Sequence, residues 1–139
     1  MYVEYERRKD IASYVCALCE GRGDLRIEDC VFCKIIKKEI PAEIVYEDDF
    51  AIAFKDINPV ARIHYLIMPK KHIPTVLDIQ DEEEKIIGHI QTVAAKIARS
   101  VLDGKGFRMV VNCLEDAGQK VFHIHYHFLA GPYFKRHSV

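Results

Sequence analysis

Apolar and polar residues alternate along the chain in a pattern that predicts several short strands and two helices. Residues 30–38 place apolar side chains at helical spacing, which predicts a short helix that ends before Pro41. A long helix is predicted after Asp81, because three glutamates there suit the positive end of a helix dipole. Apolar residues then recur every three or four positions and predict one buried face: Ile86, Ile90, Val93, Ile97 and Val101. Gly104 and Gly106 end this helix.

Five other segments have the length and composition of β-strands. They are apolar runs bounded by turn residues: Ile44–Tyr46, Ala51–Lys55, Ile63–Met68, Phe107–Asn112 and Val121–Ala130. Because strands outnumber helices and their connections are local, the pattern predicts an α+β fold with an antiparallel sheet. Residues 1–29 show no sustained periodicity. We interpret them as an N-terminal extension that carries a C-x-x-C pair, ahead of one domain over residues 30–139.

Three histidines alternate with apolar residues in the last predicted strand. His123, His125 and His127 share one face of a strand, because successive side chains point to opposite sides. The other face is expected to join the core: Phe122, Ile124, Tyr126 and Phe128. A neutral imidazole can attack phosphorus, and its N–H can donate to phosphate oxygens. Two alternatives stay open, namely a three-histidine zinc site that activates water and a merely polar strand face.

The segment from His123 to Leu129 resembles the signature of the histidine triad family. Other segments resemble the Hint branch of that family in order and spacing, and together they cover about residues 30–131. They are Cys30–Ile36, Glu39–Ala42, Asp56–Pro59, Met68–Ile73, Arg108–Asn112 and Ala117–Gln119. The resemblance implies a five-stranded antiparallel sheet with one long and one short helix. It also implies a homodimer that forms through the long helix and the adjoining strands.

By this resemblance, the chain is a hydrolase of the nucleoside phosphoramidase type. It would cleave purine nucleoside 5′-phosphoramidates or related AMP and GMP conjugates, and it would need no metal for the chemistry. His125 would attack phosphorus and form a nucleotidyl-histidine, His127 would donate to a phosphate oxygen, and His64 and His123 would complete the constellation. For His64, a purely structural strand position is the alternative. A dinucleoside polyphosphate hydrolase and a nucleotide-binding scaffold with vestigial chemistry are the alternative functions.

The resemblance also implies a nucleotide site. Asp56 corresponds to the carboxylate that binds the ribose hydroxyls, although Asp56 is also typical of a turn before Asn58. The other members would form an apolar slot for the purine or border the phosphate: Val31, Phe32, Ile35, Phe54, Ile57, Asn112, Gly118, Gln119 and Val121. The apolar members suit ordinary core positions equally well. Lys120 departs from the branch, which has serine or threonine there to donate to the leaving group, so we expect weaker phosphoramidase turnover.

Four of the five cysteines form two C-x-x-C pairs, a pattern that suggests metal ligation rather than a disulfide framework. By resemblance to the zinc-containing subgroup of the family, one structural zinc ion would be bound by four side chains: Cys30, Cys33, His72 and His123. The alternative is one site shared by both pairs: Cys16, Cys19, Cys30 and Cys33. Free thiols are a third interpretation.

Composition and charge exclude other classes of protein. A formal net charge of −1 over 139 residues, with only short basic stretches, argues against a nucleic-acid partner. No segment reaches the roughly 18 apolar residues of a membrane span, and the N-terminus lacks the apolar core of a signal peptide. We therefore expect a cytoplasmic protein, with the nucleus as a second compartment, whose partners are a purine nucleotide and a second copy of the chain.

Overall fold

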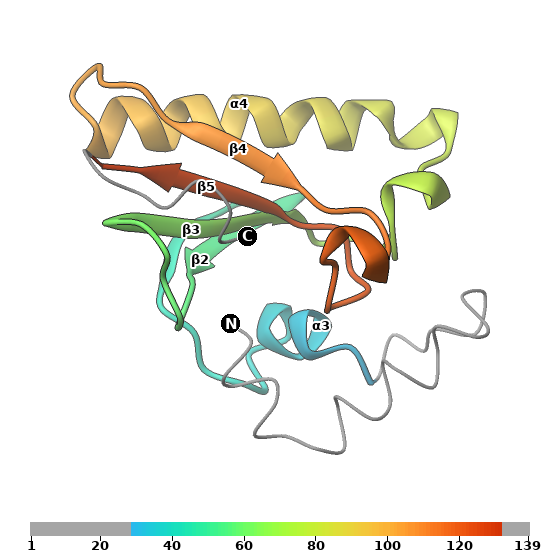
Figure 1. Ribbon diagram of the computed structural model, residues 1–139. Helices are drawn as coiled ribbons and strands as arrows, with labels where there is room; N and C mark the ends of the chain where they lie inside the picture. The colour runs from blue at the N-terminus through green and yellow to red at the C-terminus, as the bar shows by residue number, and fades with distance from the viewer. Residues whose placement is uncertain (1–28, 132–139) are drawn as a thin grey trace.

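The computed structural model describes residues 29–131 as a five-stranded sheet with helices on opposite faces (Figure 1). Helix α3 spans Val31–Ile36 and helix α4 spans Glu84–Val101. The strands are β1 Ile44–Glu47, β2 Ala51–Lys55, β3 Ile63–Pro69, β4 Arg108–Val111 and β5 Tyr126–Ala130. Short 3-10 turns are η3 Val76–Asp78, η4 Asp81–Glu83 and η5 Glu115–Ala117. The predicted N-terminal extension lies almost entirely outside the described residues.

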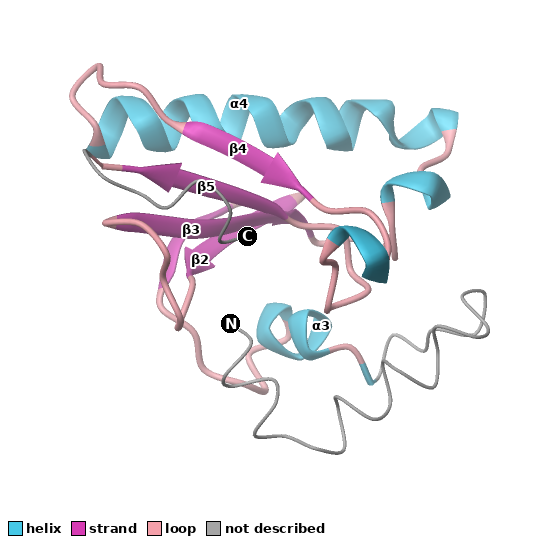
Figure 2. Ribbon diagram, in the orientation of Figure 1, coloured by secondary structure: helices cyan, strands magenta, loops and turns pink. Residues whose placement is uncertain are grey.

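The strands lie in the order β1-β2-β3-β5-β4, and all neighbours are antiparallel. This arrangement confirms the predicted α+β class, the antiparallel sheet, and the long and short helices. Figure 2 shows the sheet as one layer, with α4 above it and α3 below it. No helix within residues 29–131 has the length and apolar character needed to cross a membrane.

The sheet separates two apolar cores, because successive residues of a strand point to opposite faces. In β2, Ala51 and Ala53 pack on the α4 side, while Ile52 and Phe54 pack on the α3 side. The buried stripe of α4 consists of Ile90, Val93, Ala94, Ile97 and Ala98. Val101, which was predicted to belong to this stripe, lies in the last turn of α4 and is exposed.

Strand β5 begins five residues later than the sequence predicts. Its first residue, Tyr126, pairs with Ile67 of β3 and with Val111 at the end of β4, so residues 121–125 have no neighbouring strand. The backbone N–H of Ile124 instead donates to the carbonyl of Ile73 at 2.6 Å. His123 and His125 therefore lie just before the strand and only His127 lies on it. The expected alternation persists, since apolar residues that alternate with the histidines pack on the α4 side: Ile124, Tyr126 and Phe128.

Candidate active site and metal site

The predicted catalytic histidines are buried on the face of the sheet that α3 covers. His127 of β5 pairs with Leu66 of β3, and Leu66 packs on the α3 side. The residues His64, His125 and His127 are only 3–4% exposed. Buried polar groups need hydrogen-bond partners, so the partners of each ring define its protonation state.

His125 is held in one orientation by a backbone carbonyl. Its Nδ1 lies 2.8 Å from the carbonyl oxygen of His123, and a carbonyl can only accept, so Nδ1–H donates. Burial lowers the pKa of His125 to about 4, which keeps the ring neutral at pH 7. The edge of the ring packs against Phe32 with a centroid distance of 5.0 Å. Nε2 of a neutral ring in this state has its lone pair available for attack on an electrophile.

His64 and His127 form a hydrogen-bonded pair whose proton position is also set by the backbone. The N–H of Val60 donates to Nδ1 of His64 at 3.1 Å, so the proton of neutral His64 is on Nε2. This Nε2 lies 2.9 Å from Nδ1 of His127 and 3.2 Å from Oδ2 of Asp56. Burial lowers the pKa of both rings, that of His127 to about 2. His127 thus accepts at Nδ1 and presents Nε2–H as a donor.

Asp56, His64 and His127 also have ligand atoms within 4.8 Å of one another, as a metal site would require. The hydrogen bond from Val60 argues against such a site. Because Nδ1 of His64 accepts this bond, a metal on Nε2 would require an imidazolate, a ring with no proton on either nitrogen. We interpret this group as a hydrogen-bond relay. Across residues 29–131, no group of possible ligands contains His123, His125 and His127 together, which leaves the three-histidine zinc site unsupported.

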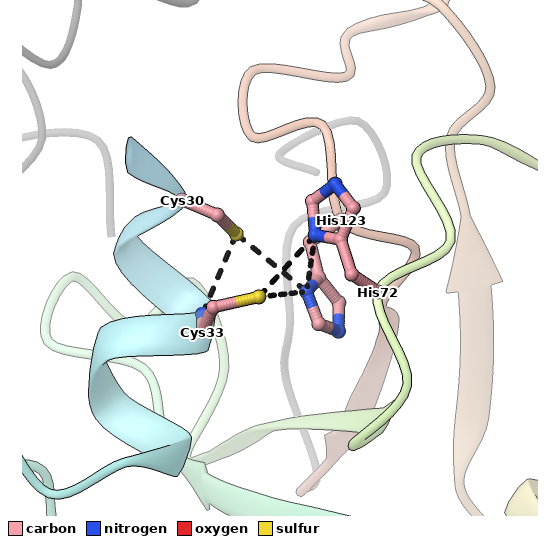
Figure 3. A group of neighbouring side chains, drawn as sticks. All are labelled: Cys30, Cys33, His72 and His123. Atoms are coloured by element: carbon pink, nitrogen blue, oxygen red, sulfur yellow. Dashed lines mark hydrogen bonds between the residues drawn. The ribbon is translucent and has the colours of Figure 1, made fainter. Parts of the chain in front are cut away.

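A second group of possible ligands, three of them buried and His72 partly buried, lies at the start of α3 (Figure 3). Cys30 is the N-cap of the helix, and its Sγ accepts the N–H of Cys33 at 3.4 Å. Sγ of Cys33 lies 3.3 Å from Nδ1 of His72 and 3.5 Å from Nδ1 of His123. Sγ of Cys30 lies 3.5 Å from Nδ1 of His123, and the two Nδ1 atoms are 3.2 Å apart.

These separations fit a tetrahedral zinc ion. Zn–S and Zn–N bonds of ordinary length place sulfur and nitrogen about 3.5 Å apart and two nitrogens about 3.3 Å apart. Nε2–H of His123 donates to the carbonyl of Pro69 at 2.8 Å, so its Nδ1 has a lone pair for a metal. Hydrogen bonds from Cys30, His123 and His72 lower the pKa of Cys33 to about 3, which makes it a thiolate. The group can hold a metal such as zinc, with protein side chains in all four positions.

The predicted apolar slot is largely a packed core. Most of its members are buried together on the α3 side: Val31, Phe32, Ile35, Phe54 and Val121. Ile57 differs, since it is 58% exposed next to the buried Asp56. Oδ1 of Asp56 accepts the N–H of Asn58 at 2.8 Å, which is the turn interaction that the sequence suggested.

The loop after β4 brings Asn112 and Gly118 together. A Cβ on Gly118 would lie 3.6 Å from Nδ2 of Asn112, and Gly118 has a φ of +96° that suits glycine. The side-chain amide of Gln119 is fully engaged with backbone. Oε1 accepts the N–H of Leu114 at 2.8 Å, and Nε2 donates to the carbonyls of Pro74 and Val121 at 2.8 and 3.0 Å. In this structure, Gln119 shapes the loop around the site.

Comparison with known proteins identifies the family. The family model described as "Scavenger mRNA decapping enzyme C-term binding" matches residues 29–137. The chain is 46% identical over 104 residues to an uncharacterized HIT-like protein of Synechocystis, covering 75% of this chain and 91% of that protein. The chain belongs to the histidine triad family. It is also 48% identical over 105 residues to the purine nucleoside phosphoramidase of Escherichia coli K12, covering 75% of this chain and 88% of that protein.

Solved histidine triad structures have the same fold. A HIT family hydrolase from Clostridium thermocellum is 50% identical with a TM-score of 0.73, covering 76% of this chain and 92% of that chain. A histidine triad protein from Clostridium difficile is 50% identical with a TM-score of 0.74, covering 79% of this chain and 96% of that chain. The predicted membership of a family of hydrolases related to nucleoside phosphoramidases is confirmed.

The groups that orient this histidine triad are mainly backbone atoms, which sequence reasoning missed. They are the N–H of Val60 and the carbonyls of Pro69 and His123. Leu114 was also missed, although its φ of 76° and ψ of 165° are rare for any residue except glycine. No side-chain type marks such positions, so the sequence offers no signal for them.

We predict that the purified protein binds one zinc ion and that His72→Ala abolishes this binding. The variant removes one of four ligands, and the loss of the metal also lowers the stability by several kcal/mol, or about 10 °C or more in melting temperature. Metal analysis by mass spectrometry, with a thermal melt of the same sample, measures both effects.

The matched control is His89→Ala, since His89 pairs with Asp48 at 2.6 Å and lies outside the metal group. This variant should keep its zinc. Zinc retained by His72→Ala would contradict the assignment and favour the all-cysteine site, whose Cys16 and Cys19 lie outside the described residues.

Proposed function

We propose that this histidine triad protein hydrolyses purine nucleoside 5′-phosphoramidates or related AMP and GMP conjugates through a nucleotidyl-histidine. The observation that carries the proposal is the state of His125, a neutral ring with Nδ1–H engaged and a lone pair on Nε2. The 48% identity to a purine nucleoside phosphoramidase supports the substrate class.

The chemistry divides into two displacements at phosphorus. Nε2 of His125 attacks the α-phosphorus, the bond to the leaving group breaks, and the leaving group takes a proton from solvent. Water then attacks the nucleotidyl-histidine and gives a proton back to solvent, which releases the nucleoside monophosphate and restores neutral His125. Nε2–H of His127 stabilises the negative charge on a non-bridging oxygen, and His64 keeps His127 in that tautomer.

The nucleotide is assigned to the residues around this relay. Asp56 would accept hydrogen bonds from the ribose hydroxyls, and the exposed Ile57 beside it would contact the base together with Phe32 and Phe54. Asn112 and Gly118 would border the phosphate from the other side. In this arrangement, Asp56 connects the ribose to His64, which it already contacts at 3.2 Å.

The metal group is proposed to hold a structural zinc ion. Because Cys30, Cys33, His72 and His123 fill all four positions, no site is left for water or substrate, and no step of the hydrolysis needs the metal. The two thiols must stay reduced to bind it, which supports the cytoplasm as the working compartment.

We predict that His125→Ala lowers turnover of an adenosine 5′-phosphoramidate by at least about 1,000-fold, since the variant lacks the nucleophile. Mass spectrometry of wild-type protein denatured during turnover should detect one added nucleotidyl group on His125. His89→Ala, on the opposite side of the sheet, serves as the control and should keep both turnover and adduct. An adduct on another residue, or turnover by His125→Ala within tenfold of wild type, would refute the mechanism.

A second prediction concerns Lys120, which is exposed next to the buried Gln119. A lysine there lacks the hydroxyl that members of the Hint branch offer to the leaving group, so Lys120→Ser should raise kcat/KM for the phosphoramidate by about tenfold. Lys105→Ser, at another exposed loop lysine, is the control and should leave kcat/KM unchanged. An unchanged kcat/KM in Lys120→Ser would show that this position does not influence the leaving group.

We also infer that two copies of the chain associate through α4 and β4. Strand β4 is at an edge of the sheet, and three apolar side chains near it are 36–44% exposed: Val101, Phe107 and Val111. Edge strands with exposed apolar residues are favourable surfaces for self-association.

We predict the mass of two chains by light scattering and the mass of one chain for Val111→Asp, because a buried unpaired carboxylate opposes association. Ile44→Asp is the matched control, since Ile44 is 38% exposed on β1 at the other edge of the sheet. The Ile44 variant should keep the wild-type mass. A single-chain mass for wild type would contradict the dimer.

A further inference from the structure

The segment between Pro69 and Thr75 contacts both the histidines and the loop around the site. It carries the metal ligand His72, and three of its backbone carbonyls accept hydrogen bonds. The carbonyl of Pro69 accepts Nε2–H of His123 at 2.8 Å, and that of Ile73 accepts the N–H of Ile124 at 2.6 Å. The carbonyl of Pro74 accepts Nε2–H of Gln119 at 2.8 Å.

His123 links this segment to the nucleophile. Its ring belongs to the metal group, where Nδ1 lies 3.2 Å from Nδ1 of His72. Its backbone carbonyl accepts Nδ1–H of His125 at 2.8 Å and thereby leaves the lone pair of His125 on Nε2. One residue therefore connects the metal ligands to the proton that orients the attacking ring.

The arrangement of His72 and His123 is the one that two ligands of a single cation would have. His123 already donates from Nε2, so its Nδ1 lone pair faces Nδ1 of His72 at close range. Nε2 of His72 is buried without a hydrogen-bond partner among the described residues, so that end of the ring is not held by any polar contact. A metal held by this group would use the Nδ1 lone pairs of His72 and His123 and would fix both rings.

We propose that His72 is a positioning residue for the hydrolysis, acting through the metal and His123 to hold the ring of His125 in its attacking orientation. The inference rests on the proposed function, because it assumes that His125 is the nucleophile. The metal fixes two imidazoles and contributes nothing to the bond changes at phosphorus. Since a displacement of about 1 Å at a reacting group can cost about 100-fold in rate, loss of the metal should lower kcat.

The kinetic test compares wild type with His72→Ala and His72→Cys, because a third thiolate can replace the imidazole as a zinc ligand. With an adenosine 5′-phosphoramidate, His72→Ala should lower kcat by about 10- to 100-fold and leave KM within about twofold. His72→Cys should regain both zinc and most of kcat. Wild-type kcat in zinc-free His72→Ala, or zinc-loaded His72→Cys that stays as slow as His72→Ala, would overturn the proposal.

A spectroscopic test does not depend on turnover. Nitrogen-15 imidazole NMR of the zinc-loaded wild type should show His125 as a single Nδ1–H tautomer. Zinc-loaded His72→Cys should show the same single tautomer. His72→Ala, or wild type freed of zinc by a chelator if that variant does not fold, should show His125 as exchanging tautomers. The same single tautomer in the folded, zinc-free protein would overturn the positioning role. Absent turnover in wild type together with a zinc-dependent tautomer would refute the proposed hydrolysis, and with it the positioning role in catalysis, while still showing that the metal orients His125.

Discussion

A neutral imidazole carries one proton on two nitrogens, and here a backbone group decides which nitrogen has it. A carbonyl fixes the proton of His125 on Nδ1, the N–H of Val60 fixes that of His64 on Nε2, and the carbonyl of Pro69 fixes that of His123 on Nε2. These three contacts assign three different roles to chemically identical side chains. They suit one ring to act as the proposed nucleophile, one to donate to its neighbour and one to bind the proposed metal.

Much of the fold was predictable because its periodicities are local. The apolar run of Ala51–Lys55 and the three- and four-residue steps after Glu84 identified their elements correctly. The start of β5 was not predictable, since it depends on where β3 and β4 stop offering partners rather than on any residue in 121–125. The alternation of histidine and apolar side chains still gave the right faces, because the chain stays extended beyond the hydrogen-bonded ladder.

The site was predictable only as far as side-chain type can indicate it. The resemblance selected Cys30, Cys33, His72 and His123, and the structure brings their ligand atoms together. Gln119 was expected to border the phosphate; its side-chain amide contacts the backbone of three other residues, and the expected nucleotide contact stays a prediction. A glutamine gives the same sequence signal in both roles, because the difference lies in which carbonyls and N–H groups the fold places around it. Leu114, whose backbone conformation is rare, donates its N–H to the side chain of Gln119, and its residue type does not indicate that conformation.

The end of β5 explains why the proposed nucleophile, His125, needs support from outside the sheet. His127 lies on a central strand, where ladders with β3 and β4 fix its backbone on both sides. His125 lies one residue before the ladders begin, so its position depends on contacts with other parts of the chain. Those contacts include the ring of Phe32 and the carbonyl of His123, and both Phe32 and His123 pack where α3 meets the metal group. Packing of α3 on the sheet is therefore coupled to the position of the His125 ring, although α3 itself supplies no proposed catalytic group.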